Sequence, residues 1–151
     1  MFLTLSLGWL LGWVGSERLL ARLTQLTYGL LAIAVALLAG WMWRSQEAML
    51  VVELGNWFEV GHYGFPLSLL VDRLSLPLVG LTVVLVGLVG SFSARYLHRD
   101  PGFFRFFLLL HLYGMGSLLL FMAGSLDLLI AGWELVGLTS VLLIGFFQQR
   151  K

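Results

Sequence analysis

The sequence contains no cysteine and few charged side chains, and each scarcity excludes a class of protein. Without cysteine the chain has neither a disulfide framework nor a thiolate metal site. Its three histidines, His62, His98 and His111, lie far apart and lack the spacing of metal ligands. Charged residues make up 11% of the chain, against about 25% in average soluble domains. We therefore expect no metal and no soluble globular fold.

The motifs of nucleotide and nucleic-acid chemistry are also missing. The net charge is +1, and the nine basic residues are scattered through loops, so no patch for nucleic acid exists. No glycine-rich nucleotide loop follows a strand, no serine, histidine and acid form a plausible catalytic set, and no histidine pair could hold haem. We expect no cofactor, no nucleic-acid partner and no hydride transfer from NADH on this chain.

Apolar residues dominate what is present. They make up 60% of the chain, more than folding in water could bury, so the solvent is lipid. A transmembrane helix needs about 20 mainly apolar residues. The pattern predicts a single all-α integral membrane domain over residues 1–151 with about five transmembrane helices, near residues 2–14, 19–44, 74–97, 102–123 and 126–147. Only about four residues separate the last two helices, which predicts antiparallel neighbours.

The first apolar segment has two interpretations. It lacks the basic start and the small-residue cleavage pattern of a signal peptide. We therefore expect a shortened first transmembrane helix. Since it is too short to span comfortably, residues missing from its start would account for its length.

Loop charges predict the orientation of the helices. If five segments span, the loops on one side carry every basic cluster, whereas the loop from Gln46 to Val71 is acidic. The clustered basic residues are Arg18, Arg22, Arg95, Arg99, Arg105, Arg150 and Lys151. This predicts a multi-pass protein of the cell inner (plasma) membrane with its N-terminus outside and its C-terminus in the cytoplasm. Arg95, Arg99 and Arg105 would set this topology and contact lipid headgroups.

The long loop between the second and third helices is the one region without a helical pattern. Val51–Val60 contains two short β-prone runs around Gly55-Asn56, a pair that tolerates positive φ. We predict a short outer β-hairpin that turns at this pair and lies on the outer membrane surface. Trp57 and Tyr63 would lie at interfacial depth, and most phenylalanines and tryptophans would face lipid or the interface.

Glu134 is the one charge deep inside a predicted span. It lies roughly ten residues into the last segment, which at about 1.5 Å per residue is near half depth. An acid at a helix centre costs about 2.5 to 3.5 kcal/mol on insertion scales, so such acids face a cavity or a partner and mark proton pathways. The alternative is a neutral glutamic acid that joins two helices by hydrogen bonds. The neighbouring residues expected to pack or form a cavity beside it are Gly132, Trp133, Gly137, Thr139 and Ser140.

Two further positions are candidates for a proton pathway. Asp72 and Arg73 begin the third helix, where they would form an anchor and an N-terminal cap, or alternatively an interfacial ion pair that helps to open a proton exit. Histidine titrates near neutral pH, so His111, six residues into its apolar segment, is a candidate relay. Its alternative role is a hydrogen bond to a neighbouring helix.

Three stretches together resemble a known family. The stretches are Leu69–Ser75, Tyr96–Phe107, and Gly132–Leu138 with Leu142–Phe146. They are similar to the antiporter-like membrane subunit of proton-translocating NADH–quinone oxidoreductase, the subunit L type of complex I. The resemblance covers most of the chain from about Val51 onward. It implies that Glu134 is the fifth-helix glutamate of a proton half-channel and that Asp72 is the acid at the start of the third helix.

The sequence also departs from that family. Its members have around fourteen helices, and their glutamate pairs with a lysine on a broken seventh helix, whereas the only lysine here is Lys151. Val141 stands where complex I members often have tyrosine, and Arg73 where they often have a small residue. These two changes resemble the membrane subunit of energy-coupled inorganic-carbon accumulation complexes.

The leading hypothesis is the N-terminal part of a proton-conducting subunit of an NADH–quinone oxidoreductase-like complex, as a truncated copy or one piece of a split protein. Such a chain would couple proton translocation to energy conversion, and its partners would be lipid, other membrane subunits and a soluble subunit. One alternative is a membrane subunit for bicarbonate or CO2 accumulation driven by proton motive force. The other is a non-catalytic scaffold or inactive remnant.

Overall fold

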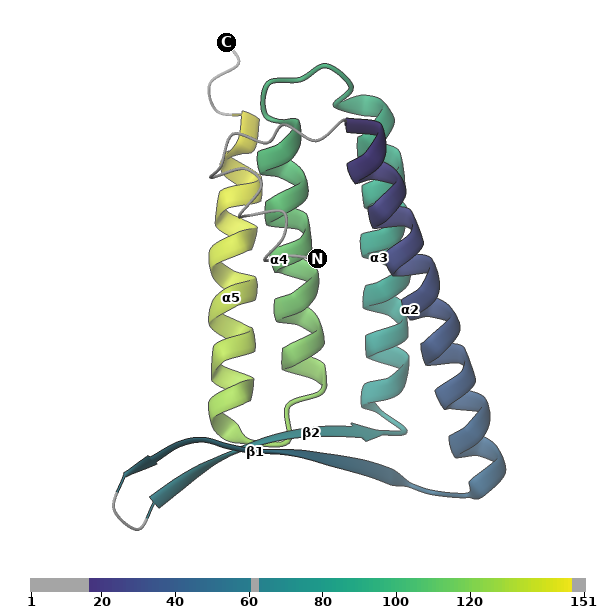
Figure 1. Ribbon diagram of the computed structural model, residues 1–151, viewed down its shortest axis with the longest axis vertical. Helices are drawn as coiled ribbons and strands as arrows, with labels where there is room; N and C mark the ends of the chain where they lie inside the picture. Colours follow the sequence, from purple (N-terminus) through teal and green to yellow (C-terminus); the bar gives the residue numbers. More distant parts are fainter. Residues whose placement is uncertain (1–16, 61–62, 148–151) are drawn as a thin grey trace.

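Four long helices stand on one β-hairpin in the computed structural model, which describes residues 17–60 and 63–147 (Figure 1). The predicted helix near residues 2–14 lies outside the described residues. The elements in chain order are α2 (Glu17–Ser45), β1 (Met49–Val60), β2 (Tyr63–Asp72), α3 (Ser75–Tyr96), α4 (Phe103–Phe121), α5 (Leu126–Ile144) and the short 3₁₀ turn η1 (Gly145–Phe147).

The four described helices are each long and apolar enough to cross a membrane. Their positions agree with the predicted spans to within a few residues, because runs of uncharged residues and the charges that flank them mark the boundaries. The all-α membrane class is confirmed. The helices alternate in direction, and α4 and α5 pack as antiparallel neighbours, as the short connection between them predicted (Figure 1).

Small residues let neighbouring helices approach closely. A Cβ atom added at Gly90 of α3 would lie 3.1 Å from Thr24 Cγ2 of α2, and one at Gly87 would lie 3.2 Å from Tyr28 Cβ. Such contacts are typical of helix pairs in lipid, where van der Waals packing replaces the hydrophobic effect between helices. Close van der Waals packing between complementary surfaces therefore stabilises the α2–α3 pair.

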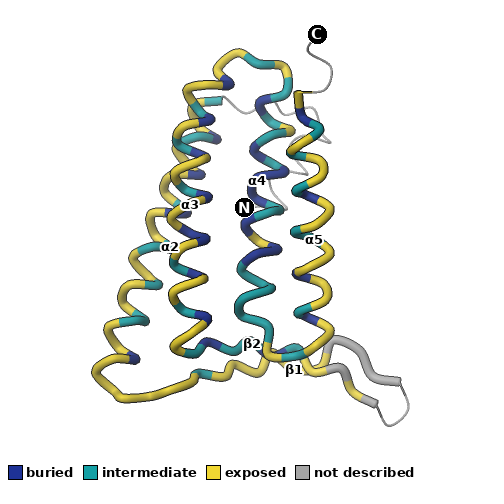
Figure 2. The backbone as a smooth tube through the Cα atoms, turned by 180° about the vertical axis from the view of Figure 1, so that it is seen from behind, coloured by how far each residue is buried: buried dark blue, intermediate teal, exposed yellow. Residues whose placement is uncertain are grey.

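Aromatic side chains fill the interior at the end of the bundle where α2 begins. Phe103, Phe107 and Phe146 are buried there together with Leu20 and Leu97. The expectation that phenylalanines mostly face lipid is wrong for these three. Phe103 and Phe107 lie on α4, which is inside the bundle, and Phe146 of η1 packs against them. Figure 2 shows the buried residues concentrated along α4, with exposed residues on the outer faces of α2, α3 and α5.

The predicted hairpin is present, but its turn lies elsewhere. β1 and β2 pair antiparallel from Met49 opposite Asp72 to Val60 opposite Tyr63. Gly55, with φ of 99°, lies inside β1, where the register shifts between Glu53 and Asn56. A glycine with positive φ suits a β-bulge as well as a turn, which is why the sequence signal was misplaced. The depth predicted for Trp57 and Tyr63 falls on side chains outside the described set.

The hairpin is fastened to the bundle through the connection between α4 and α5. The Leu70 N–H donates to the Met122 carbonyl over 2.8 Å, and the Gly124 N–H donates to the Ser68 carbonyl over 2.9 Å. A Cβ on Gly124 would lie 2.6 Å from Ser68 Oγ, so the close approach requires glycine. Strand β2 is thereby fixed across the ends of α4 and α5.

Candidate functional site

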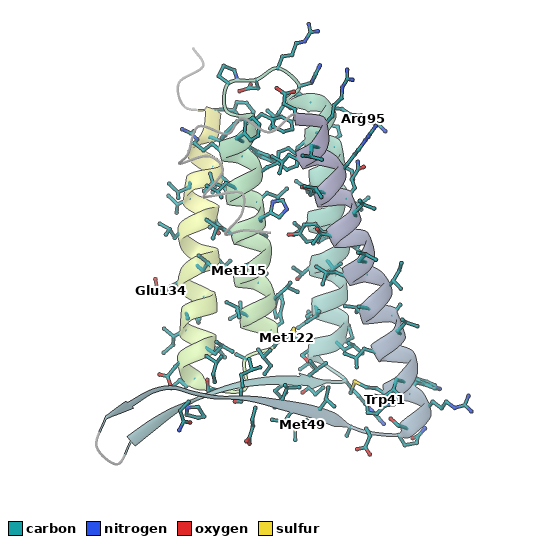
Figure 3. The ribbon with its side chains drawn as sticks, in the orientation of Figure 1. Trp41, Met49, Arg95, Met115, Met122 and Glu134 are labelled. Atoms are coloured by element: carbon teal, nitrogen blue, oxygen red, sulfur yellow. The ribbon has the colours of Figure 1, made fainter. Side chains whose placement is uncertain are left out.

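Glu134 lies near the middle of α5 and points away from the other described helices (Figure 3). Its side chain is exposed. The same outer surface of α5 carries Trp133, Leu138 and Val141, which are 68%, 61% and 67% exposed. The acid is therefore surrounded by apolar side chains at mid-span, on a surface that no described element covers.

The opposite side of α5 packs against α4. With 3.6 residues per turn, Gly132 is roughly 160° around the helix from Glu134. A Cβ added at Gly132 would lie 2.6 Å from the Leu120 backbone nitrogen, so this glycine permits the contact between α4 and α5. Thr139 is fully buried on this side. The predicted neighbours of Glu134 thus divide between two faces of one helix.

The two hydroxyl groups near Glu134 bond within their own helix. Thr139 donates to the Leu135 carbonyl over 2.7 Å, and Ser140 donates to the Val136 carbonyl over the same distance. By contrast, a Cβ added at Gly137 would meet nothing within 4 Å. Gly137 is about one turn from Glu134 and is exposed on that side of the helix. The exposed side therefore offers a carboxyl group and open space beside it.

His111 occupies a separate place, between α4 and α2. Its Nδ1 lies 2.6 Å from the Phe107 carbonyl, and because a carbonyl only accepts, Nδ1 carries the proton. Its Nε2 lies 3.4 Å from Thr24 Oγ1, and the centroids of the His111 and Tyr28 rings are 5.7 Å apart. Thr24, which the sequence did not single out, donates its own hydroxyl to the Leu20 carbonyl over 2.9 Å. In this arrangement the hydrogen bond of His111 stays within α4, and its Nε2 contacts α2 at Thr24 without a proton between the two atoms.

Asp72 caps the first turn of α3. Its Oδ1 accepts the N–H groups of Ser75 and Leu74 over 2.6 and 2.9 Å, and its own N–H donates to Ser75 Oγ over 2.8 Å. This reciprocal pattern has the logic of a capping box. The Ser75 backbone N–H is the largest of the influences that lower the pKa of Asp72, and the N–H of Leu74 lowers it further. The predicted cap is present, and the carboxylate form is the one it favours.

The cap should make the stability of α3 depend on pH. Because the pKa of Asp72 is lowered in the folded state, its contribution is present above the ordinary carboxyl pKa of 3.8 and is lost as pH falls through the lowered value. Asp72→Ala should therefore lower the Tm of the full chain in detergent at pH 7, and this difference should shrink in acid. Glu53→Ala on the exposed hairpin is the control. A difference independent of pH would contradict the assignment.

The predicted topology arginines lie together at the end of the bundle opposite the hairpin, where Figure 3 labels Arg95. The Arg105 guanidinium lies 5.1 Å from the centre of the Phe146 ring, so it joins the start of α4 to η1, which follows α5. Glu17 accepts from the Arg99 N–H over 3.2 Å and lies 2.8 Å from His98 Nδ1. Sequence reasoning missed this link, because its partners are 81 residues apart.

The three proton-pathway candidates are not brought together. Glu134 lies on the outer side of α5, His111 between α2 and α4, and Asp72 at the hairpin end. Within residues 17–60 and 63–147, no hydrogen bond joins any two of them. The same ranges contain no group of three or more potential metal ligands. In the described part of the chain, neither His111 nor Asp72 is therefore a direct partner for Glu134.

The sequence of this chain matches a known family of membrane subunits. Residues 57–107 match the family model described as NADH-ubiquinone oxidoreductase (complex I), chain 5 N-terminus. NADH-quinone oxidoreductase subunit L of Escherichia coli K12 is 30% identical over 132 residues, which cover 87% of this chain and 22% of that protein. Subunit L of Mycobacterium tuberculosis H37Rv is 34% identical over 119 residues, covering 78% and 19% respectively.

A cyanobacterial relative extends the comparison. NAD(P)H-quinone oxidoreductase chain 5 of Synechocystis is 31% identical over 99 residues, covering 66% of this chain and 14% of that protein. The chain thus spans about a fifth or less of the length of these curated relatives, at 22%, 19% and 14%. Their names do not favour the inorganic-carbon alternative. The matches identify this chain as a relative of the N-terminal part of the antiporter-like subunit of complex I, the subunit named L or chain 5.

Proposed function

We propose that this chain acts within a proton-translocating membrane subunit of an NADH–quinone oxidoreductase-like complex and that Glu134 is its proton-carrying group. The observation that carries the proposal is an acid at mid-span on a face of α5 that no described element covers. A carboxyl group exposed to lipid there would cost about 2.5 to 3.5 kcal/mol. In a chain related to complex I subunits, covering by another protein element removes that cost and supplies a group with which to exchange the proton.

The surroundings of Glu134 suit such an exchange. The open space around Gly137 leaves room beside the carboxyl group for water or for a side chain of the covering element. A cation there would favour the carboxylate, and its withdrawal would favour protonation, so the acid would bind and release a proton in each cycle. The family resemblance implies a lysine in that role. The covering element and the other membrane subunits of the complex are part of the proposal.

Asp72 and His111 would act at other points of a pathway. Asp72, at the hairpin end, lies where protons would leave or enter the membrane. His111 presents its unprotonated Nε2 to the junction of α2 and α4, so it could accept a proton only from that side. Neither residue contacts Glu134. Transfer between them would need water or groups on covering elements.

We further propose that the basic end of the bundle faces the cytoplasm and the hairpin faces outward. Among the described residues, Arg18, Arg22, Arg95, Arg99 and Arg105 belong to the basic end, whereas Arg44 and Arg73 belong to the hairpin end. This asymmetry agrees with the positive-inside rule. If the predicted first segment also spans, this orientation corresponds to an outside N-terminus and a cytoplasmic C-terminus in a plasma membrane.

The orientation can be tested directly, because the chain has no native cysteine. Glu53→Cys in the hairpin should react with a membrane-impermeant maleimide in intact cells. Arg95→Cys at the opposite end should react only after permeabilisation. The reverse labelling pattern would invert the proposed topology.

Proton translocation can be tested by removing and restoring the chain. In inverted membrane vesicles, NADH-driven acidification should be lost when the gene is deleted, and a plasmid copy should restore it. An NADH-driven gradient that persists undiminished would contradict the proposed function. Loss of bicarbonate-dependent growth with normal acidification would instead support inorganic-carbon uptake.

A further inference from the structure

A groove of about 390 Å³ opens between the end of α2 and the start of α3, away from Glu134. Figure 1 shows why it forms: α2 leans away from α3 as both helices approach the hairpin. The inner wall of this α2–α3 groove is apolar and comprises Ala39, Met42, Leu76 and Pro77. Trp43, Gln46 and Arg73 complete its lining. The groove thus combines an apolar interior with polar groups at the helix ends.

The groove lies at the hairpin end of two helices that are long and apolar enough to span a membrane, where lipid headgroups are expected to meet the hydrocarbon. Gln46 follows the end of α2 and Arg73 precedes the start of α3. Ala39 lies roughly 9 Å from Ser45, the last residue of α2, at about 1.5 Å per residue, and so lies deeper in the bundle. Pro77 has no backbone N–H, so it adds no donor to the apolar wall. Trp43 is 84% exposed beside the groove, as tryptophans at membrane interfaces commonly are.

Arg73 provides a cation at the mouth of the groove. Its Nη2 lies 3.5 Å from the Gln46 carbonyl, at the limit of hydrogen-bond distance. Its guanidinium forms no salt bridge with a carboxylate in the described part of the chain. The side chain is exposed, so most of its five N–H donors can reach a ligand. An exposed guanidinium that forms no salt bridge can donate two parallel hydrogen bonds to a pair of phosphate oxygens.

We propose that the α2–α3 groove binds an anionic phospholipid, with the phosphate on Arg73 and an acyl chain along the apolar wall. Charge complementarity selects the anionic headgroup, and the apolar interior selects a molecule that carries a hydrocarbon chain. Inorganic phosphate would satisfy Arg73 but leave the wall uncovered. A zwitterionic lipid would cover the wall but bring no net negative charge. This binding site is independent of the role proposed for Glu134.

Native mass spectrometry of the full chain in detergent tests the proposal. Phosphatidylglycerol and phosphatidylcholine with identical acyl chains, and inorganic phosphate, are titrated separately. Phosphatidylglycerol should bind about fivefold more tightly than phosphatidylcholine, as expected for one basic residue near an anionic headgroup. Arg73→Gln should abolish this preference, and Arg73→Lys should retain part of it. Inorganic phosphate should show no measurable binding.

Arg44→Gln is the matched control, because Arg44 lies in the last turn of α2 at the same end but does not line the groove. It should keep the preference for phosphatidylglycerol. Leu76→Trp, which fills the groove, should weaken binding of both lipids, and circular dichroism checks that each variant is folded. Equal binding of the two lipids, equal effects of the Arg73 and Arg44 variants, or phosphate binding as tight as lipid binding would overturn the proposal.

Discussion

Glu134→Gln is expected to lower NADH-driven proton translocation about a hundredfold in the assembled complex, the lower end of what a positioned proton-transfer group contributes. Glutamine has nearly the same shape and still forms hydrogen bonds, but it cannot carry the proton. The change lies on the exposed side of α5, away from the α4 contact, so the fold of this chain should persist. Acidification of inverted vesicles on adding NADH measures the effect.

Two controls separate proton transfer from assembly. Glu134→Asp keeps a carboxyl group on a shorter side chain and should retain more activity than the glutamine variant. Glu53→Gln removes an acid from the exposed hairpin and should leave acidification unchanged. If Glu134→Gln pumps normally, the acid has no transport role. If activity falls only in proportion to the amount of assembled complex, Glu134 joins helices instead.

Gly132→Ala is expected to destabilise the chain by about 2 kcal/mol, within the range for overpacked cores. The new Cβ would lie 2.6 Å from the Leu120 nitrogen and 2.9 Å from its Cα. Both atoms belong to the backbone of α4, so no side chain can rotate away and the two helices must separate. Reversible unfolding in mixed detergent micelles, followed by circular dichroism, measures the loss.

Gly137→Ala on the same helix is the matched control. Its Cβ would meet no atom within 4 Å, and alanine favours the helix over glycine by about 1 kcal/mol. The isolated chain should therefore keep or gain stability. Equal destabilisation by the two alanines would show that the contact between α4 and α5 is looser than these distances indicate.

The helical spans could be predicted because they depend on local properties. The third span was expected at residues 74–97, and α3 occupies Ser75–Tyr96. A run of uncharged residues that is long enough to cross lipid fixes such a helix without reference to its neighbours. The depth of Glu134 and the cap at Asp72 follow from position along the chain in the same way.

Orientation around each helix axis could not be predicted. The described helices are apolar on nearly all sides, so their sequences carry little of the periodicity that marks a buried face. This explains why the burial of Phe103, Phe107 and Phe146 was missed. The same limit applies to α5, where Gly132 and Gly137 look alike in sequence but lie on opposite sides. Contacts such as Thr24 with His111 join residues 87 positions apart.

The hydrogen bonds between β2 and the connection from α4 to α5 have a consequence for biogenesis. Leu70 and Ser68 leave the ribosome about fifty residues before Met122 and Gly124, with which they bond. Strand β2 is therefore synthesised before the connection that pairs with it, and its free edge can serve as a template when that connection arrives. Insertion of α4 and α5 would then end when their connection docks on β2, so the integration of these two helices would depend on a hairpin that is already in place.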